Sequence, residues 1–130
     1  MNKIKKNDLE WKEILSSEEY DVLRKKGTEL PYSGFFNNHF ESGIYSCKGC
    51  GNELYKSENK FDSGCGWPSY DKCIDNSIEY RKDTSLKKNR TEILCAKCGG
   101  HQGHVFDDGH TSTGKRYCVN SASINFNLEK

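Results

Sequence analysis

The chain has 130 residues, of which 30% are charged and 33% are apolar, and its formal net charge is +1. This length predicts one domain over residues 1–130, and the mixture of charge signs is typical of a soluble globular protein. A net charge this close to zero supplies no field that would gather nucleic acid or an anionic membrane. The basic residues 1–6 precede no apolar run, and no apolar stretch is long enough to cross a membrane. We therefore expect neither a signal peptide nor a membrane span.

The N-terminal segment, residues 8–27, is expected to be helical. Four apolar residues recur at roughly helical spacing in its first half: Leu9, Trp11, Ile14 and Leu15. Ser17 precedes two glutamates and suits the N-cap of a second helix, and Gly27 follows two lysines and suits its end. The prediction is two short helices that break near Ser16 and Ser17 and cover one side of a sheet.

From residue 31 onward, turn residues recur every few positions, with short strand-like runs between them. The runs are residues 43–47, 53–56, 77–81, 91–95 and 116–126. Several alternate in polarity, which is typical of antiparallel strands with one solvated face. The sequence thus predicts a mainly β fold, and the charged run 83–90 is interpreted as a solvated connection.

Seven cysteines are an odd number, and a full set of structural disulfides would leave one thiol over. Metal ligation combined with redox chemistry explains this count better than a disulfide scaffold does. We therefore expect a reducing, cytoplasmic setting.

The motif Cys-x-x-Cys-Gly occurs twice, at residues 47–51 and 95–99. A spacing of two residues lets a tight turn direct both sulfurs at one ion, and the following glycine lets backbone amides turn towards the thiolates. Two such turns would form the tetrahedral site of structural zinc, with these ligands: Cys47, Cys50, Cys95 and Cys98. The alternative, a redox motif of thioredoxin type, requires a βαβ context that the sequence lacks.

Cys118 has no partner cysteine nearby in the sequence, and Arg116 and Asn120 lie two positions to either side. In a strand, side chains at alternate positions share a face, so these three residues would point the same way. A neighbouring cation lowers the pKa of a thiol and favours the reactive thiolate. The stretch therefore suits a nucleophile, although a buried structural cysteine beside an exposed arginine would explain it equally well.

Two glycine-rich loops carry further reactive side chains. In residues 63–70, glycines flank Cys65 and leave it accessible. Trp67 in the same loop either offers a flat surface to an apolar, sulfur-containing ligand or belongs to the core. In residues 99–108, two histidines and two aspartates form a set typical of acid–base catalysis: His101, His104, Asp107 and Asp108. Metal binding by the histidines is the alternative, but the expected zinc already has four sulfurs.

Three blocks of sequence, in this order, resemble the peptide methionine-R-sulfoxide reductases, the MsrB family. They are residues 61–69 (FDSGCGWPS), residues 90–92 (RTE) leading to 98–106 (CGGHQGHVF), and residues 116–121 (RYCVNS). The likeness extends from the N-terminal helices almost to the end of the chain. It implies a fold of two antiparallel sheets with N-terminal helices, and a structural zinc remote from catalysis.

The resemblance also implies a role for each reactive residue. Cys118 would be the nucleophile that becomes a sulfenic acid, and Cys65 would resolve it as a Cys118–Cys65 disulfide. His104 is the expected acid, and Trp67 is expected to pack on the substrate methyl group. Five residues would order the sulfoxide oxygen and its waters: His101, His104, Asp108, Arg116 and Asn120. The implied substrates are oxidised proteins or peptides containing methionine sulfoxide, and thioredoxin is the implied reductant of a monomeric enzyme.

Two positions stand outside the family pattern. Tyr70 replaces the usual phenylalanine, and Cys73 is either a buried small residue or a second resolving thiol.

Two other functions compete with methionine sulfoxide reduction. A zinc-ribbon binding module would explain the two cysteine motifs but neither Cys118 nor Cys65, and the near-neutral charge argues against nucleic acid. A thiol peroxidase or redox sensor would explain the reactive thiols but has no need of Trp67.

Overall fold

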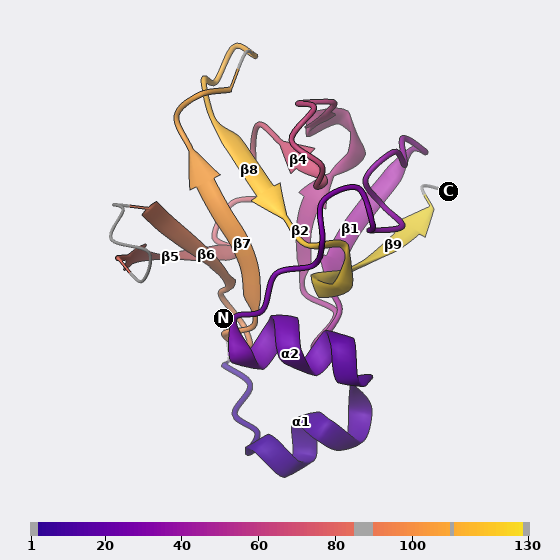
Figure 1. Ribbon diagram of the computed structural model, residues 1–130, viewed down its shortest axis with the longest axis vertical. Helices are drawn as coiled ribbons and strands as arrows, with labels where there is room; N and C mark the ends of the chain where they lie inside the picture. Colours follow the sequence, from indigo (N-terminus) through magenta and orange to yellow (C-terminus); the bar gives the residue numbers. More distant parts are fainter. Residues whose placement is uncertain (1–2, 85–89, 110, 129–130) are drawn as a thin grey trace.

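The computed structural model describes residues 3–84, 90–109 and 111–128, and two antiparallel sheets make up most of these ranges (Figure 1). The helices are α1 (Asp8–Ile14) and α2 (Ser17–Lys25), and two 3-10 turns are η1 (Ser57–Asn59) and η2 (Ser121–Ser123). The strands are β1 (Gly43–Cys47), β2 (Glu53–Lys56), β3 (Lys60–Phe61), β4 (Ser69–Tyr70), β5 (Ile78–Asp83), β6 (Arg90–Cys95), β7 (His101–Phe106), β8 (Arg116–Val119) and β9 (Ile124–Leu128). The predicted mainly β fold of two sheets with N-terminal helices is confirmed. Most of the charged run interpreted as a connection, residues 85–89, lies outside the described ranges.

The two helices begin where the sequence can satisfy their free amide groups. Asn7 caps α1 and Ser16 caps α2, and in each case a glutamate three residues later completes a capping box. The predicted break between the helices is confirmed, but the prediction of Ser17 as N-cap is wrong because the Ser16 hydroxyl accepts the hydrogen bond. The second helix also ends before Gly27, since Lys26 itself adopts the left-handed conformation, with φ 59°.

The strand order is β2-β1-β9 in the smaller sheet and β3-β4-β8-β7-β6-β5 in the larger one. The prediction of a single strand over residues 116–126 is wrong, because the chain changes sheets within this run. After β8, the backbone amide and the side-chain amide of Asn120 both donate to the carbonyl oxygen of Gln102. The turn η2 then redirects the chain, and β9 pairs with β1. This run therefore ties the two sheets together.

Aromatic side chains fill the space between the sheets. Tyr55 of β2 stacks on Tyr70 of β4 with ring centroids 4.4 Å apart, and Tyr45 of β1 meets Tyr70 edge to face at 5.3 Å. All three are fully buried, and burial raises the pKa of Tyr70 well above its ordinary value, which keeps its hydroxyl neutral. The family departure at position 70 thus lies in the core, where the ring packs as phenylalanine would.

The two helices lie together at one end of both sheets (Figure 1). Trp11 of α1 is 1% exposed, and a Cβ atom on Gly49 would lie 3.2 Å from its ring. The Arg24 guanidinium lies over the Trp11 ring at 4.7 Å and donates to the Cys98 carbonyl oxygen at 2.9 Å. The N-terminal helices therefore cover the loops that carry the two Cys-x-x-Cys motifs.

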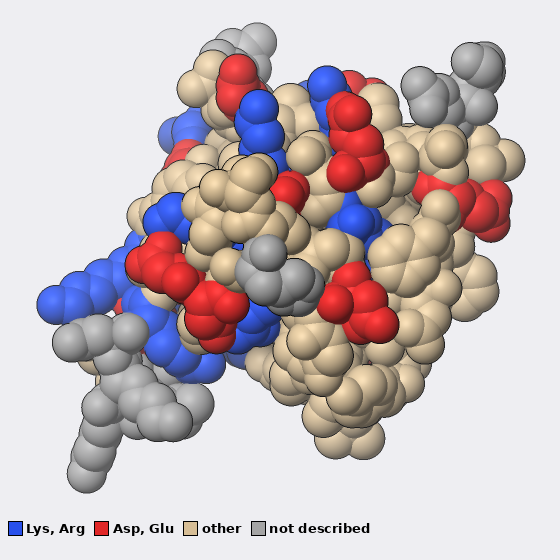
Figure 2. Space-filling view, turned by 90° about the horizontal axis from the view of Figure 1, so that it is seen from above, with Lys and Arg blue, Asp and Glu red and all other residues tan. Residues whose placement is uncertain are grey.

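The surface carries charges of both signs. On the face shown in Figure 2, acidic and basic side chains are interspersed among uncharged residues. This face therefore lacks the continuous basic stripe typical of nucleic-acid binding. Among the described residues, no helix has the length and apolar character needed to span a bilayer.

Candidate active site and metal centre

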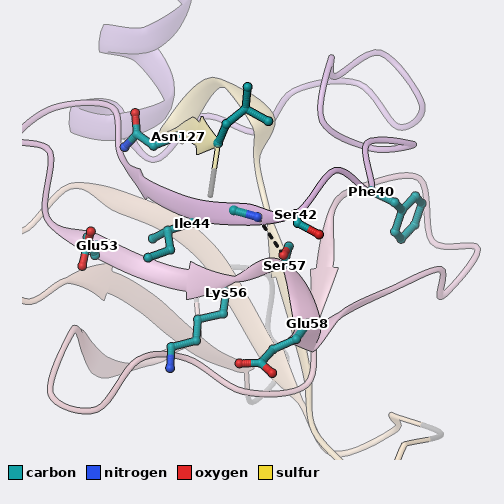
Figure 3. A pocket seen from close by; sticks show the side chains of 10 residues that line it. Phe40, Ser42, Ile44, Glu53, Lys56, Ser57, Glu58 and Asn127 are labelled. Carbon is teal, nitrogen blue, oxygen red and sulfur yellow. Dashed lines mark hydrogen bonds between the residues drawn. The ribbon is translucent and has the colours of Figure 1, made fainter. Parts of the chain in front are cut away.

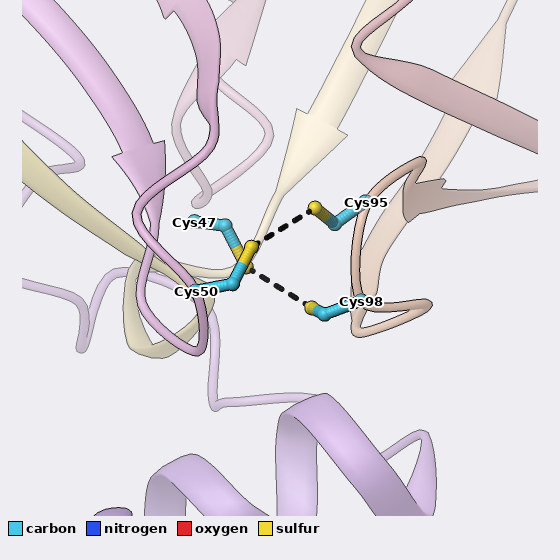
Figure 4. A group of neighbouring side chains, drawn as sticks. All are labelled: Cys47, Cys50, Cys95 and Cys98. Carbon is cyan, nitrogen blue, oxygen red and sulfur yellow. Dashed lines mark hydrogen bonds between the residues drawn. The ribbon is translucent and has the colours of Figure 1, made fainter. Parts of the chain in front are cut away.

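Four cysteine side chains point towards one another from two loops (Figure 4). Their sulfur atoms all lie within 4.8 Å of one another, and two pairs, Cys47–Cys98 and Cys50–Cys95, lie 3.6 Å apart. Tetrahedral zinc with Zn–S bonds of about 2.3 Å holds its sulfurs about 3.8 Å apart. The cluster therefore fits a metal ion of this kind.

Polar hydrogens surround the cysteine sulfurs, as thiolate ligands require. Three donor–sulfur contacts are Gly100 N–H to Cys98 at 3.4 Å, Asn52 Nδ2 to Cys95 at 3.6 Å and Gln102 Nε2 to Cys47 at 3.9 Å. Gln102 is fully buried and lies on β7, two residues before His104. One strand thus contributes both to the cysteine cluster and to the site described next.

A second pair of sulfurs lies in the larger sheet. β4 pairs with β8 so that Ser69 is opposite Cys118, which brings the Cys65 loop beside β8. The Sγ atoms of Cys65 and Cys118 lie 3.8 Å apart, and Cys65 Sγ also lies 3.4 Å from Ser69 Oγ. A disulfide requires a sulfur separation of about 2.05 Å. A small local shift would therefore join the two sulfurs.

Gly103 of β7 permits the close approach of β8. Its φ is +155°, and a Cβ atom there would collide with the carbonyl oxygen of Cys118. A residue without a side chain is therefore required. With the strands this close, His104 pairs directly with Cys118 across β7 and β8, so the imidazole and the thiol start from opposed positions.

A cavity of about 120 Å³ lies where these groups meet. Its lining residues are Thr28, Trp67, Arg90, Gly103, His104, Phe106, Cys118, Val119 and Asn120. Cys118, His104, Trp67 and Asn120 were predicted as site residues, and the structure brings them together here. Thr28, Arg90 and Phe106 were not. Arg90 and Phe106 stand within the matched blocks, whereas Thr28 comes from a separate segment that carries no motif.

The segment between α2 and β1 supports two of these residues through Glu29. The Trp67 indole donates Nε1–H to the Glu29 carbonyl oxygen at 3.0 Å, and the Asn120 side-chain oxygen accepts from the Glu29 amide at 3.0 Å. Asn120 is 3% exposed, and its amide also donates to the Gln102 carbonyl oxygen at 3.2 Å. Both polar ends of the Asn120 amide are thus occupied, which rigidifies this wall of the cavity.

Besides Cys65, which contacts Cys118, three other predicted site residues do not line the cavity. His101 is 3% exposed, and its Nδ1 lies 2.6 Å from Glu92 Oε2. Burial lowers the pKa of His101, and the hydrogen bond with Glu92 opposes this effect. Asp108 lies on the surface and accepts two hydrogen bonds from Arg116, at 2.9 and 3.1 Å, which lower the pKa of its carboxyl. The Arg116 guanidinium lies 4.4 Å from the ring of Phe106, a residue of the cavity wall.

Comparison with known proteins adds a family to this geometry. The sequence matches the SelR domain over residues 15–128. The peptide methionine sulfoxide reductase MsrB of Methanosarcina barkeri is 50% identical over 128 residues, which are 98% of this chain and 90% of the relative. Proteins of the same name from Hahella chejuensis and Leptospira interrogans are 54% and 48% identical over 97% of this chain, and over 91% and 97% of their own lengths. The chain belongs to the MsrB family.

Membership in the MsrB family confirms the resemblance drawn from the three sequence blocks. It makes the chain an oxidoreductase. The family assignment covers nearly the whole chain, so the cavity and the cysteine cluster both lie within the matched region.

The two facing thiols of this MsrB chain have opposite acidities. A hydrogen bond from the Cys118 thiol, with smaller contributions from Ser63 and Ser69, lowers the pKa of Cys65 to about 4. The same contact and then burial raise the pKa of Cys118, while Arg116 lowers it. Arg116 acts in the direction expected from the sequence, but its effect is smaller than the opposing effects of Cys65 and burial. As the pH rises, Cys65 is therefore the first of the two to lose its proton, and the Cys118 thiol then donates a hydrogen bond to the Cys65 thiolate.

This acidity predicts unusual labelling of Cys65. A thiol with a pKa of about 4 is ionised above that pH, so its alkylation by iodoacetamide should be nearly constant from about pH 6 to pH 8. The alkylation rate of an ordinary thiol, with a pKa of about 8.5, should fall about tenfold for each unit by which the pH is lowered from 8 to 6. Peptide mapping after timed labelling measures the rate at each cysteine.

The matched control for this labelling is Cys118→Ala, which removes the hydrogen-bond donor and leaves Ser63 and Ser69 in place. We expect Cys65 of this variant to become less reactive at pH 6. The low pKa assigned to Cys65 would be contradicted if its labelling rate in the wild-type chain fell tenfold for each pH unit between pH 8 and pH 6.

A larger hollow lies elsewhere, on the smaller sheet (Figure 3). It measures about 690 Å³ and is lined by Phe40, Ser42, Gly43, Ile44, Glu53, Lys56, Ser57, Glu58, Asn127 and Leu128. No cysteine or histidine is among these residues, so the groove offers no redox group. The smaller cavity beside Cys118 is lined by a thiol and an imidazole together.

Cys73 contacts two tyrosines rather than the reactive pair. Its Sγ lies 3.7 Å from the Tyr80 hydroxyl and 4.0 Å from the Tyr117 hydroxyl. Tyr117 and Cys118 are consecutive in β8 and point to opposite faces of the sheet. This arrangement supports the interpretation of Cys73 as a small packing residue rather than a second resolving thiol.

Proposed function

We propose that this chain reduces peptide-bound methionine-R-sulfoxide to methionine, with Cys118 as the nucleophile and Cys65 as the resolving thiol. The observation that carries the proposal is the 3.8 Å separation of the two sulfurs beside a cavity lined by Trp67 and His104. Relatives that are about half identical over nearly the whole chain are named peptide methionine sulfoxide reductase MsrB. The 1–130 chain would act as one domain.

In the first step, the Cys118 thiolate attacks the sulfoxide sulfur while His104 protonates the sulfoxide oxygen. A sulfur–sulfur bond forms as the sulfur–oxygen bond of the substrate breaks and the oxygen leaves as water. Water then attacks the Cys118 sulfur, which breaks the sulfur–sulfur bond and leaves Cys118 as a sulfenic acid. Methionine sulfoxide gains two electrons and leaves as methionine, and Cys118 loses two. General acid catalysis is needed because the oxygen is a poor leaving group until it is protonated.

In the wild-type chain, the nucleophile forms by one proton transfer within the thiol pair, whereas without Cys65 the proton of Cys118 would pass to solvent. The proton moves from Cys118 to the Cys65 thiolate along the 3.8 Å contact, so the charge passes to Cys118. Arg116 favours this state because its positive charge lowers the pKa of Cys118. The arginine is itself oriented by its two hydrogen bonds to Asp108, so these two residues would act on the nucleophile rather than on the substrate.

In the second step, the Cys65 thiol condenses with the sulfenic acid, releasing water and forming the Cys118–Cys65 disulfide. A dithiol reductant then reduces this disulfide and becomes oxidised in turn. We propose thioredoxin for this role, with the chain acting as a monomer in the cytoplasm. Proteins or peptides that contain oxidised methionine would be the substrates.

The substrate would contact the face of the Trp67 ring and the part of the cavity wall formed by Asn120. An indole surface suits the polarisable sulfur and methyl of the substrate, and the hydrogen bond to Glu29 fixes its orientation. His101 and Asn120 would order the oxygen and its waters indirectly, through the strand ends that they hold. The four-cysteine cluster would bind one structural zinc, whose role is to hold β1 and β6 together.

The proposed function predicts strict selectivity for one sulfoxide configuration. The thiol, the acid and the tryptophan face occupy fixed positions around one cavity, so a sulfur of the opposite configuration cannot present its oxygen and its methyl group correctly. With dithiothreitol as reductant, we expect the R epimer of dabsylated methionine sulfoxide to be reduced at least about 100-fold faster than the S epimer. Chromatography of each pure epimer measures this ratio.

Equal rates on the two epimers would contradict the proposal. Hydrogen peroxide in place of the sulfoxide provides the control for a thiol peroxidase, because such an enzyme would turn over peroxide and leave both epimers unreduced.

A further inference from the structure

His104 has a carboxylate partner that the sequence motifs do not include. Its Nε2 lies 2.8 Å from Oδ2 of Asp83, the last residue of β5. The two residues are 21 positions apart in the sequence. His104 lies on β7, and β6 separates β7 from β5 in the sheet. The contact therefore spans one intervening strand at the edge of the site.

Arg90 holds this carboxylate from the intervening strand. Its guanidinium donates to the same Asp83 oxygen at 3.2 Å, and the two residues pair across β5 and β6. The side chains of Asp83 and His104 are 9% and 13% exposed, so little water competes for the contact. Arg90 and His104 both line the cavity, whereas Asp83 lies behind them.

The contact decides which ring nitrogen of His104 carries the proton. An ionised carboxylate only accepts hydrogen bonds, so neutral His104 carries its proton on Nε2. Nδ1 is then bare, and it makes no hydrogen bond with any described residue. A proton added to the ring is therefore held on Nδ1, the nitrogen left for a bound sulfoxide.

We propose that Asp83 is a positioning residue for the acid step, and that Arg90 in turn orients Asp83. This inference rests on the proposed function. Asp83 stabilises the charged ring before proton donation and favours the Nε2–H tautomer afterwards. Asp83 is not among the residues that line the cavity, so we expect it to act through His104.

The other histidine of this loop has a similar partner but a different environment. His101 pairs with Glu92, which is fully buried, and Lys26 Nζ lies 3.2 Å from the second Glu92 oxygen. His101 does not line the cavity. Its carboxylate pair is therefore part of the packing between β6 and β7, and the pair at His104 is the one that faces the chemistry.

Several charged or titratable groups surround the His104 ring, and each belongs to a named element. They are Asp83 from β5, Arg90 and Glu92 from β6, His101 from β7 at a ring separation of 5.6 Å, and Cys118 from β8. Among them, Asp83 is the carboxylate in direct contact with the ring. Its removal should therefore destabilise the charged ring, and the loss of rate at high pH should begin at lower pH.

The test replaces Asp83 by asparagine, whose amide can donate to Nε2 and so favours the wrong tautomer. We expect Asp83→Asn to release methionine about 10- to 100-fold more slowly in a single turnover, with unchanged KM. Its rate should also decline at lower pH than that of the wild-type chain. Nitrogen-15 spectra of the His104 ring should change from the Nε2–H to the Nδ1–H tautomer, and Asp83→Glu should recover part of the rate.

Glu79→Gln is the matched control, because it removes an exposed carboxylate from the same strand. It should leave the rate, the pH profile and the His104 spectrum unchanged. An Asp83→Asn chain with wild-type rate and pH profile would overturn the inference, and so would a slow chain in which the tautomer and the pH profile are those of the wild type. Failure of the proposed function is distinguishable, because the wild-type chain would then release no methionine from either epimer.

Discussion

We expect Cys118→Ser to release no methionine from methionine-R-sulfoxide, a loss of more than about 10³-fold. A serine hydroxyl at this position is a far weaker nucleophile towards sulfur, and it cannot form a sulfenic acid. The replacement is nearly isosteric in a half-buried position, so the fold should persist. Methionine release in a single turnover, without added reductant, measures the loss.

Cys65→Ser should behave differently, because Cys65 is proposed to act after methionine has left. We expect this variant to release about one methionine per chain and to accumulate a sulfenic acid on Cys118. Its turnover with thioredoxin should fall sharply, since no intramolecular disulfide can form, while small thiols should partly restore it. The serine hydroxyl can still donate to a Cys118 thiolate, which supports the first step.

Mass spectrometry after one equivalent of substrate separates the two thiols. The wild-type chain should carry a Cys118–Cys65 disulfide, as the 3.8 Å contact favours. A Cys118–Cys73 disulfide with Cys65 still reduced would overturn the assignment, and so would complete loss of the first step in Cys65→Ser.

The second large effect concerns the cysteine cluster. We expect one zinc ion per chain, and we expect Cys98→Ser to lose the metal and most of its cooperative unfolding transition. Structural zinc sites contribute about 10–16 kcal/mol in small peptides, which is comparable to the whole stability of a domain, about 5–15 kcal/mol. The cluster is also the point where α1 and α2 pack on the sheets through Trp11 and Arg24, so its loss should release the helices as well.

Cys73→Ser is the control for the metal prediction, because Cys73 is a half-buried cysteine outside the cluster. It should retain the zinc and melt within a few degrees of the wild-type chain. Metal analysis and calorimetry are the measurements. A folded, active chain without zinc, in which Cys47 and Cys50 form a disulfide, would contradict the prediction.

Local sequence determined much of this protein. The capping boxes at Asn7 and Ser16 define both helix starts within four residues, and each Cys-x-x-Cys motif directs its two sulfurs within a single turn. These features depend on neighbours in the chain, so the sequence predicts both helices and both cysteine turns, with the N-cap of α2 misplaced by one residue. The three matched blocks likewise identify the family, because their residues are consecutive.

Only the tertiary structure decided how these pieces meet. The change of sheet after Val119, the entry of Thr28 into the cavity and the contact of Asp83 with His104 all join segments that are distant in sequence. The acidity of Cys65 depends on such a contact too, since its hydrogen bond to Cys118 spans 53 positions. Strand register sets these distances, and register follows from the packing of whole sheets rather than from any local pattern.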